Sequence, residues 1–83
     1  MLITYDDAKR EANIAKHGLD FEALVDGVFF ETALVRPARN GRFMAIGRLA
    51  DGTISVVFAR LGAQGISIIS MRPASVKERK LLS

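Results

Sequence analysis

The stretch that decides the fold is residues 42–72, RFMAIGRLADGTISVVFARLGAQGISIISMR. Apolar and polar residues alternate in three runs, residues 42–49, 53–61 and 65–72, and this spacing predicts β-strands. Segments 50–52 and 62–65 separate the runs and are typical of hairpin turns because they contain glycine. The stretch therefore predicts three consecutive strands that pair as an antiparallel meander.

The residues before this stretch predict two helices. Residues 1–5 alternate weakly and predict a short edge strand or an extended lead-in. Asp6 or Asp7 can then cap a helix over residues 7–17, which Gly18 ends. Asp20 can cap a second helix, whose apolar residues repeat at three- and four-residue spacing until near Phe30.

The remaining segments complete a small α+β domain. From Thr32 the spacing becomes that of a strand, which Pro37 and the turn-like residues 39–41 close. After Pro73, Ser75 and the acid three residues later have the order of a capping box and predict a helix over residues 76–82. We expect one domain over residues 1–83, with two N-terminal helices, an antiparallel sheet of about four strands and a short C-terminal helix.

Composition excludes several classes of site. The 83 residues are 49% hydrophobic and 25% charged, as in globular domains, and no apolar run approaches the roughly 20 residues that cross a bilayer. The N-terminus lacks the pattern of a signal peptide, so we expect a cytoplasmic protein without membrane contact. The chain has no cysteine and one histidine, which argues against disulfides, a thiolate nucleophile and a metal centre. We expect no cofactor and no metal.

Arginines concentrate in the predicted sheet. Residues 35–60 contain five of them and one acid, Asp51: Arg36, Arg39, Arg42, Arg48 and Arg60. If both hairpins are centred on their turns, Arg42 lies opposite Arg60, while Arg48 and Arg72 flank Ile54 on the same face. This face then carries Arg42, Met44, Ile46, Arg48, Ile54, Val56, Phe58, Arg60, Ile66, Ile68, Ser70 and Arg72.

This arginine-bracketed face permits two interpretations. The planar guanidinium of Arg matches phosphate oxygens, and few acids are available in this half of the chain, so the face is a candidate phosphate site. The alternative is that these side chains extend from strand ends and pair with Asp or Glu of the helices. A register shift of one residue would send every side chain to the other face.

His17 and Lys16 lie in the last turn of the first predicted helix. Histidine is the side-chain type that changes charge near neutral pH, so His17 is a candidate general acid or base. The structural alternative is that His17 caps helix carbonyls and Lys16 is solvated. Neither a P-loop, nor a dinucleotide fingerprint, nor a G-x-S-x-G elbow is present, and with one tyrosine and no tryptophan a base-stacking platform is not evident.

An ordered set of short motifs nevertheless resembles the BrnT toxin family over nearly the whole chain. The motifs are Asn13-x-x-Lys16-His17-Gly18-x-x-Phe21, Val28-Phe29, Arg42-Phe43-x-x-Ile46-Gly47, Val56-Val57-Phe58, Ile69-Ser70-x-Arg72-x-Ala74 and Glu78-Arg79. The resemblance implies a RelE-like ribonuclease fold, cleavage of bacterial RNA, and a ribbon-helix-helix antitoxin similar to BrnA. It also implies that the complex with this antitoxin represses its own operator.

Two positions depart from the family pattern. Members commonly have an acid followed by Arg where this chain has Arg60-Leu61, and many have Arg where this chain has Ser67. Either departure can weaken catalysis. Arg60 substitutes for the missing arginine only if it reaches the same space from the other strand face, and the pleat argues against this.

The resulting hypothesis is a metal-independent endoribonuclease toxin. RNA supplies its own nucleophile, the 2′-hydroxyl, so cationic groups that stabilise the phosphorane-like transition state provide much of the catalysis. We expect Arg42, Arg60, Arg72 and Arg79 to bind the scissile phosphate and Lys16 or His17 to transfer protons. The alternative is a non-catalytic partner of a DNA-binding antitoxin. An antitoxin that dimerises would bring two toxins to two antitoxins, with operator DNA bound through the antitoxin.

Overall fold

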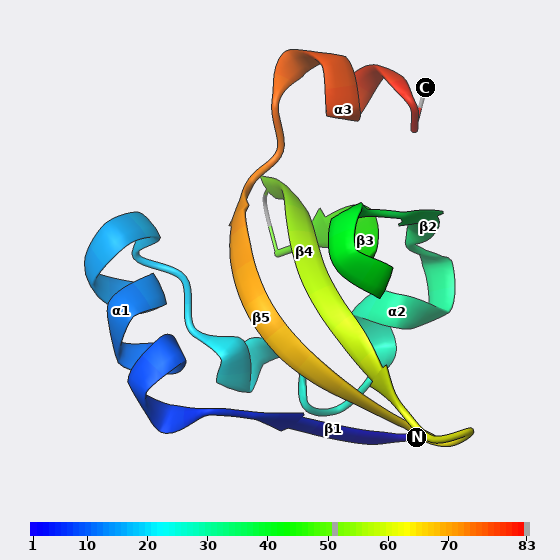
Figure 1. Cartoon of the computed structure of the whole chain (residues 1–83). Helices are drawn as coiled ribbons and strands as arrows, with labels where there is room; N and C mark the ends of the chain where they lie inside the picture. The colour runs from blue at the N-terminus through cyan, green and yellow to red at the C-terminus, as the bar shows by residue number, and fades with distance from the viewer. Residues whose placement is uncertain (51, 83) are drawn as a thin grey trace.

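The computed structural model describes residues 1–50 and 52–82, and a mixed five-stranded sheet forms its centre (Figure 1). The strand order is β1-β5-β4-β3-β2, and β1 is parallel to β5 while the other pairs are antiparallel. The strands are β1 (Leu2–Tyr5), β2 (Leu34–Pro37), β3 (Phe43–Leu49), β4 (Gly52–Leu61) and β5 (Gly65–Pro73). The α+β class is confirmed. The strand count exceeds the expected four because residues 2–5 join the sheet edge.

Three short α-helices and two 3₁₀ turns surround the sheet. They are α1 (Asp7–His17), η1 (Phe21–Leu24), α2 (Val28–Thr32), η2 (Arg39–Gly41) and α3 (Val76–Lys80). The bounds of α1 are as predicted, because the Asp6 carboxylate accepts from the Lys9 N–H and Gly18 ends the helix with φ 70°. None of the helices in the described parts of the chain is long and apolar enough to span a membrane.

The second predicted helix is broken into η1 and α2. Asp20 caps η1 as expected, but Gly27 adopts φ 79°, which cannot continue a right-handed helix. The chain therefore turns at Gly27, and a new helix, α2, begins at Val28, whose N–H donates to the Asp26 carboxylate at 3.0 Å. The prediction of one continuous helix ending near Phe30 was wrong for this reason.

The hydrophobic core lies between these two short helices and one face of the sheet. Phe21 and Leu24 of η1 and Phe29 of α2 are buried there, against sheet residues Ala45, Ile54, Val56, Phe58, Ile66, Ile68 and Met71. The packing is closest at Gly47, where an added Cβ would lie 3.0 Å from Cε1 of Phe29. A glycine is therefore required where α2 approaches the sheet.

The pairing of β3 with β4 differs by one residue from the expected register. Leu49 pairs with Gly52, so the hairpin loop has two residues rather than three, and Ala50 adopts φ 52°. Asp51, part of the predicted turn, lies outside the described residues. As a result Arg48 pairs with Thr53 and Ile46 with Ser55, and the even-numbered residues of β3 lie on the face opposite Ile54, Val56 and Phe58.

A β-bulge changes the register of β4 with β5. Near the turn the pairing is as expected, with Phe58 opposite Ile68, but beyond the bulge Val57 pairs with Ser70 and Ser55 with Arg72. Arg72 is therefore on the face opposite Ile54, whereas Arg60 is on the core side. The prediction that one face carries both Arg60 and Arg72 was wrong.

The C-terminal helix α3 follows β5 after Pro73 and projects beyond the end of the sheet (Figure 1). The predicted capping box is confirmed: the Glu78 N–H donates to Ser75 Oγ, and the Glu78 carboxylate accepts from the Ser75 N–H. The helix ends at Lys80 rather than at residue 82. Its charged side chains are thereby held at the same end of the sheet as Arg72.

Candidate functional site

The sheet has one helix-covered face and one open face. The strand register places Leu34, Arg36, Met44, Ile46, Arg48, Thr53, Ser55, Val57, Ser70 and Arg72 on the open face. Ile46 and Ser55 are buried there, and the other residues are partly or fully exposed. The α1 helix borders this face along β5, and α3 follows the end of β5 (Figure 1). We call this surface the open face; it carries no carboxylate from the strands.

The α1 helix is fixed to β5 by one buried amide. Asn13, 6% exposed, donates from Nδ2 to the Leu19 carbonyl at 2.9 Å and accepts from the Met71 N–H at 3.0 Å. Asn13 thereby occupies the edge of β5 beyond Tyr5, the last residue of β1. The side chain satisfies a strand N–H that would otherwise be stranded in the core.

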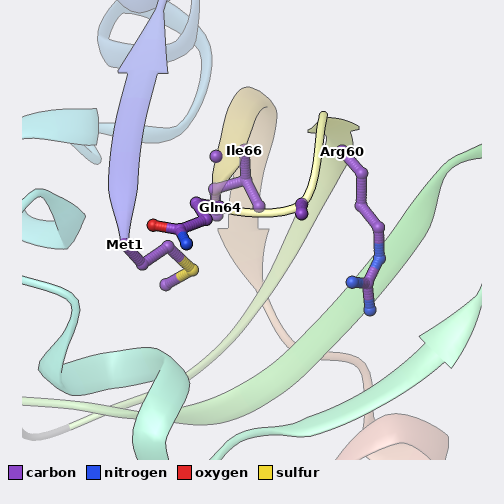
Figure 2. A pocket seen from close by; sticks show the side chains of 6 residues that line it. Met1, Arg60, Gln64 and Ile66 are labelled. Atoms are coloured by element: carbon purple, nitrogen blue, oxygen red, sulfur yellow. The ribbon is translucent and has the colours of Figure 1, made fainter.

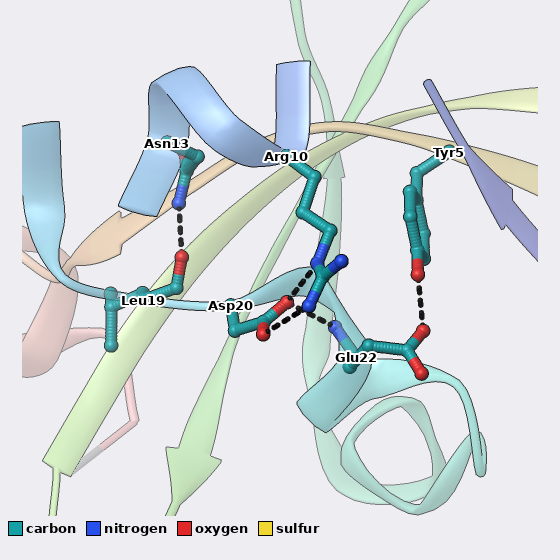
Figure 3. A network of polar contacts seen from close by, with 6 residues as sticks. All are labelled: Tyr5, Arg10, Asn13, Leu19, Asp20 and Glu22. Atoms are coloured by element: carbon teal, nitrogen blue, oxygen red, sulfur yellow. Dashed lines mark hydrogen bonds and ion pairs between the residues drawn. The ribbon is translucent and has the colours of Figure 1, made fainter. Parts of the chain in front are cut away.

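A second polar contact holds the chain that follows α1 (Figure 3). Arg10 binds both carboxylate oxygens of Asp20, at 2.7 and 2.8 Å, and this pairing lowers the pKa of Asp20 to about 2. Beside it, the Tyr5 hydroxyl donates to the Glu22 carboxylate, and this hydrogen bond raises the pKa of Tyr5. Together with Asn13, these contacts fix α1 against the sheet, so its last turn has a defined position.

The docked helix brings three predicted site residues together. Lys16, His17 and Arg72 line one depression of about 410 Å³ between α1 and β5. Its remaining walls are Lys9, Ala12, Asn13, Ile69 and Ser70. Lys9 and Ser70 were not predicted, although Lys9 is seven residues before Lys16, a spacing that places both on one helix face.

His17 faces this depression instead of serving as a helix cap. It is half-buried, and none of the side-chain hydrogen bonds in residues 1–50 and 52–82 involves its imidazole. The end of the helix is satisfied by Gly18, whose N–H donates to the Ile14 carbonyl at 2.8 Å. The imidazole therefore has its polar atoms available to a bound molecule.

Arg72 is held by Glu78 of α3. Its two terminal nitrogens each donate to one carboxylate oxygen at 2.7 Å. The hydrogen bond from Arg72 lowers the pKa of Glu78 to about 2, and the same contact raises the pKa of Arg72. The expectation that arginines pair with helix acids thus applies to Arg72, whose side chain remains 40% exposed. Arg72 is a rigidly oriented guanidinium beside Lys16 and His17.

Two further arginines line a second depression, next to α3. Arg48 and Arg79 line a depression of about 220 Å³ with Thr53 and Leu82. Arg79 was a predicted site residue, and Arg48 was absent from that set although alternation had placed it on the face of Arg72. Neither is among the residues of the two ion pairs in the described chain, so both charges are available to an anion.

The two other predicted phosphate ligands lie elsewhere. The Arg60 guanidinium lies 4.8 Å from the centre of the Phe43 ring on the core side of the sheet. Arg42 immediately precedes β3 and is exposed. Alternation places Arg42 on the same face as Met44. At about 3.3 Å per residue, Arg42 lies roughly 13 Å along the strand from Ile46. The structure therefore does not bring Arg42 opposite Arg60, nor either of them into the depression beside α1.

The described residues contain no group of three His, Asp or Glu side chains able to hold a metal ion. The chemistry that this geometry offers comes from cations: Lys16, Arg72, Arg48 and Arg79, with His17 able to carry or release a proton. Such a set fits a ligand with several negative charges, above all a phosphodiester backbone.

Comparison with known proteins decides the family. A family model described as the ribonuclease toxin BrnT of a type II toxin-antitoxin system matches residues 5–78. The chain belongs to the BrnT family. A 1.1 Å crystal structure of the Brucella abortus ribonuclease toxin BrnT is 47% identical, with a TM-score of 0.82. The match covers 90% of this chain and 97% of the Brucella protein. No curated protein sequence matches the chain.

Two of the departures from the BrnT pattern, Leu61 and Ser67, fall on the open face. Ser67 pairs with Thr4 and Ala59, and alternation along β4 places Leu61 on the same side as Ala59. The commonly expected arginines at 61 and 67 would both extend from the open face. Arg60 cannot replace them, because it extends from the core side. Arg36, Arg48 and Arg72 are the arginines that the strand register places on this face.

Proposed function

We propose that this chain is a metal-independent endoribonuclease toxin that binds the RNA backbone on its open face. The observation that carries the proposal is the depression that joins Lys16 and His17 of α1 to Arg72 of β5. A general acid or base, an ammonium and a fixed guanidinium within one hollow are the groups that phosphodiester cleavage requires. Family membership supports the ribonuclease activity.

The proposed reaction uses the substrate's own 2′-hydroxyl. The His17 imidazole accepts the hydroxyl proton while the 2′-oxygen forms a bond to phosphorus, and the bond from phosphorus to the 5′-oxygen breaks. The leaving 5′-oxygen takes a proton from the Lys16 ammonium. The products are a 2′,3′-cyclic phosphate and a 5′-hydroxyl.

The arginines stabilise the negative charge of the transition state and position the strand. Arg72 contacts the scissile phosphate from a position fixed by Glu78, so little rearrangement is needed during the reaction. Arg48 and Arg79 bind a neighbouring phosphate at the second depression, next to α3. Removal of one well-placed cationic donor from such a site lowers the rate by about 10²–10³-fold.

The proposed partner is a ribbon-helix-helix antitoxin. Type II membership implies an antitoxin, and we extend this to a BrnA-like dimer that holds two toxin copies and binds its operator. The arrangement predicts that the complex binds DNA through the antitoxin and that the toxin alone does not.

A digestion assay tests the catalytic proposal. Purified parent protein should cleave single-stranded RNA in the presence of EDTA and leave cyclic phosphate ends. Lys16→Ala, His17→Ala and the pair Arg72→Ala with Arg79→Ala should each lose at least about 100-fold in rate. Lys80→Ala and Arg39→Ala remove equal charge outside both depressions and should cleave as the parent does. Full activity of the double arginine variant would refute the assignment of these residues.

One observation favours a second candidate function, that of a non-catalytic subunit in an antitoxin repressor complex. Both terminal nitrogens of Arg72 are already bound to Glu78, and Ser67 and Leu61 occupy positions where the family commonly has Arg. In that case the parent protein cleaves no RNA, and operator affinity of the complex exceeds that of the antitoxin alone. The same digestion assay, followed by an operator-binding titration, separates the two.

A further inference from the structure

Two adjoining depressions surround Arg60 on the core side of the sheet, opposite the open face. One, of about 230 Å³, is apolar except for Arg60 and is lined by Met1, Phe30, Val35, Phe58, Arg60 and Ile66. The other, of about 350 Å³, shares Met1, Arg60 and Ile66 and continues to the β4–β5 turn at Ala63, Gln64 and Gly65. Figure 2 shows Arg60 and Gln64 on either side of this second hollow. We call the two together the Arg60 depression.

The charge of Arg60 is unpaired among the described residues. The two ion pairs of residues 1–50 and 52–82 join Arg10 to Asp20 and Arg72 to Glu78. The Arg60 guanidinium is exposed and lies over the Phe43 ring, which orients it without neutralising its charge. Because Arg60 is already partly ordered, pairing it with an acid costs less side-chain entropy than pairing a freely moving arginine would.

The strand beside this depression is a sheet edge with exposed apolar side chains. β2 is the last strand of the sheet on its side, and its apolar residues Leu34 and Val35 are 37% and 43% exposed. Val35 also forms one wall of the depression. Arg36 and Pro37 hinder the addition of another strand at this edge, whereas exposed apolar side chains such as Val35 are typical of protein interfaces.

We infer that the Arg60 depression is the docking site of an antitoxin segment that presents an apolar side chain next to a carboxylate. The inference rests on the proposed function, which supplies the antitoxin. The apolar side chain enters the hollow between Phe30, Val35 and Phe58, and the carboxylate pairs with Arg60. Charge complementarity identifies the partner as acidic and amphipathic.

The lining argues for protein over RNA as the occupant. An RNA backbone needs several cations spaced along it, and the open face provides them, whereas among the side chains that line this depression Arg60 is the one cation and most of the others are apolar. An apolar anchor beside a charge-assisted hydrogen bond is the pattern of protein interface hot spots. Because the two surfaces lie on opposite sides of the sheet, antitoxin affinity and RNA cleavage should be separable by mutation.

Charge reversal at Arg60 tests this inference. The probe is the purified antitoxin that abolishes growth inhibition when it is co-expressed with the chain, titrated onto the full-length toxin by calorimetry. Arg60→Glu should weaken binding by at least about 30-fold and Arg60→Lys by about three- to tenfold, because Lys keeps the charge and loses the planar fork. Arg39→Glu makes the same charge change outside the depression and should alter the Kd less than about twofold.

The outcomes separate this inference from the proposed function. Arg60→Glu toxin without antitoxin should cleave RNA at the parent rate. An antitoxin Kd for Arg60→Glu within about twofold of the parent overturns the docking site. If Arg60→Glu leaves the antitoxin Kd unchanged and slows RNA cleavage about tenfold, the docking site is also overturned, because the depression then binds RNA. A parent protein that binds antitoxin and cleaves no RNA refutes the proposed ribonuclease and leaves the docking measurement intact.

Discussion

Removal of the Asn13 side-chain amide should lower the free energy of unfolding substantially. Its hydrogen bond from the Met71 N–H joins α1 to β5 across 58 residues of chain, and its bond to the Leu19 carbonyl holds the segment that follows α1. Asn13→Ala removes both bonds and leaves the two backbone groups without a partner. Met71 is fully buried, so its N–H gains no water in exchange.

The expected loss of stability can be worked from these two groups. A buried polar group without a partner costs about 1–3 kcal/mol, and the upper part of that range applies to the Met71 N–H. Leu19 is half-buried, so its carbonyl is partly rehydrated and costs less. The higher helix propensity of alanine offsets about 0.5 kcal/mol of this loss in the free energy of unfolding. Together these give a decrease of roughly 2–3 kcal/mol in the free energy of unfolding.

Urea unfolding followed by circular dichroism measures this decrease. Glu11→Ala, at an exposed position of the same helix, is the matched control and should change stability by less than about 0.5 kcal/mol. Asn13→Asp keeps an acceptor for Met71 and lacks the donor for Leu19, so it separates the two bonds. An Asn13→Ala protein as stable as the Glu11→Ala control would refute the argument that this amide holds α1 on the sheet.

Three other perturbations have definite expected results. Arg72 lowers the pKa of Glu78 from 4.5 to about 2, so its stabilisation is present above pH 4.5 and is lost as the pH falls toward 2. The gap in urea midpoint between parent and Glu78→Gln should shrink over that window, and a constant gap would contradict the pairing. Gly47→Ala places a Cβ 3.0 Å from Phe29 and should lower the unfolding free energy by about 1–3 kcal/mol; unchanged thermal melting would contradict this. Ser55 is 1% exposed and its hydroxyl has no partner among the described residues, so Ser55→Ala should stabilise by roughly 1 kcal/mol, and a destabilised variant would show that the hydroxyl is bonded.

Local signals in the sequence were sufficient for most elements and for part of the site. Asp6 and Gly18 defined α1, and Ser75 with Glu78 defined the start of α3, because caps depend on residues a few positions apart. Lys16 and His17 were recognised as candidates from their chemistry. Their proximity to Arg72 depends on Asn13 and on the pairing of strands, which no local pattern describes.

The wrong predictions arose where a register shift of one residue moves side chains to the other face of the sheet. The β3–β4 loop has two residues rather than three, and the bulge at Val57 and Phe58 adds one more shift in β5. Each shift moves a set of side chains across the sheet. Alternation without these shifts therefore places Arg60 on the face of Arg72. It places Arg48 there as well, so the register does not explain why Arg48 is missing from the predicted phosphate ligands. Turn type and bulges depend on packing, so alternation alone could not decide them.

The parallel pairing of β1 with β5 has a consequence for synthesis of the toxin. β1 leaves the ribosome first, yet it pairs with residues 65–68. The hydrogen bond of Asn13 likewise needs the N–H of Met71. The hollow that contains Lys16, His17 and Arg72 cannot exist until nearly the whole chain has emerged. Contacts of such high sequence separation also form late in folding. A nascent or truncated chain that ends before Arg72 therefore lacks this hollow, and its cationic groups are not yet assembled.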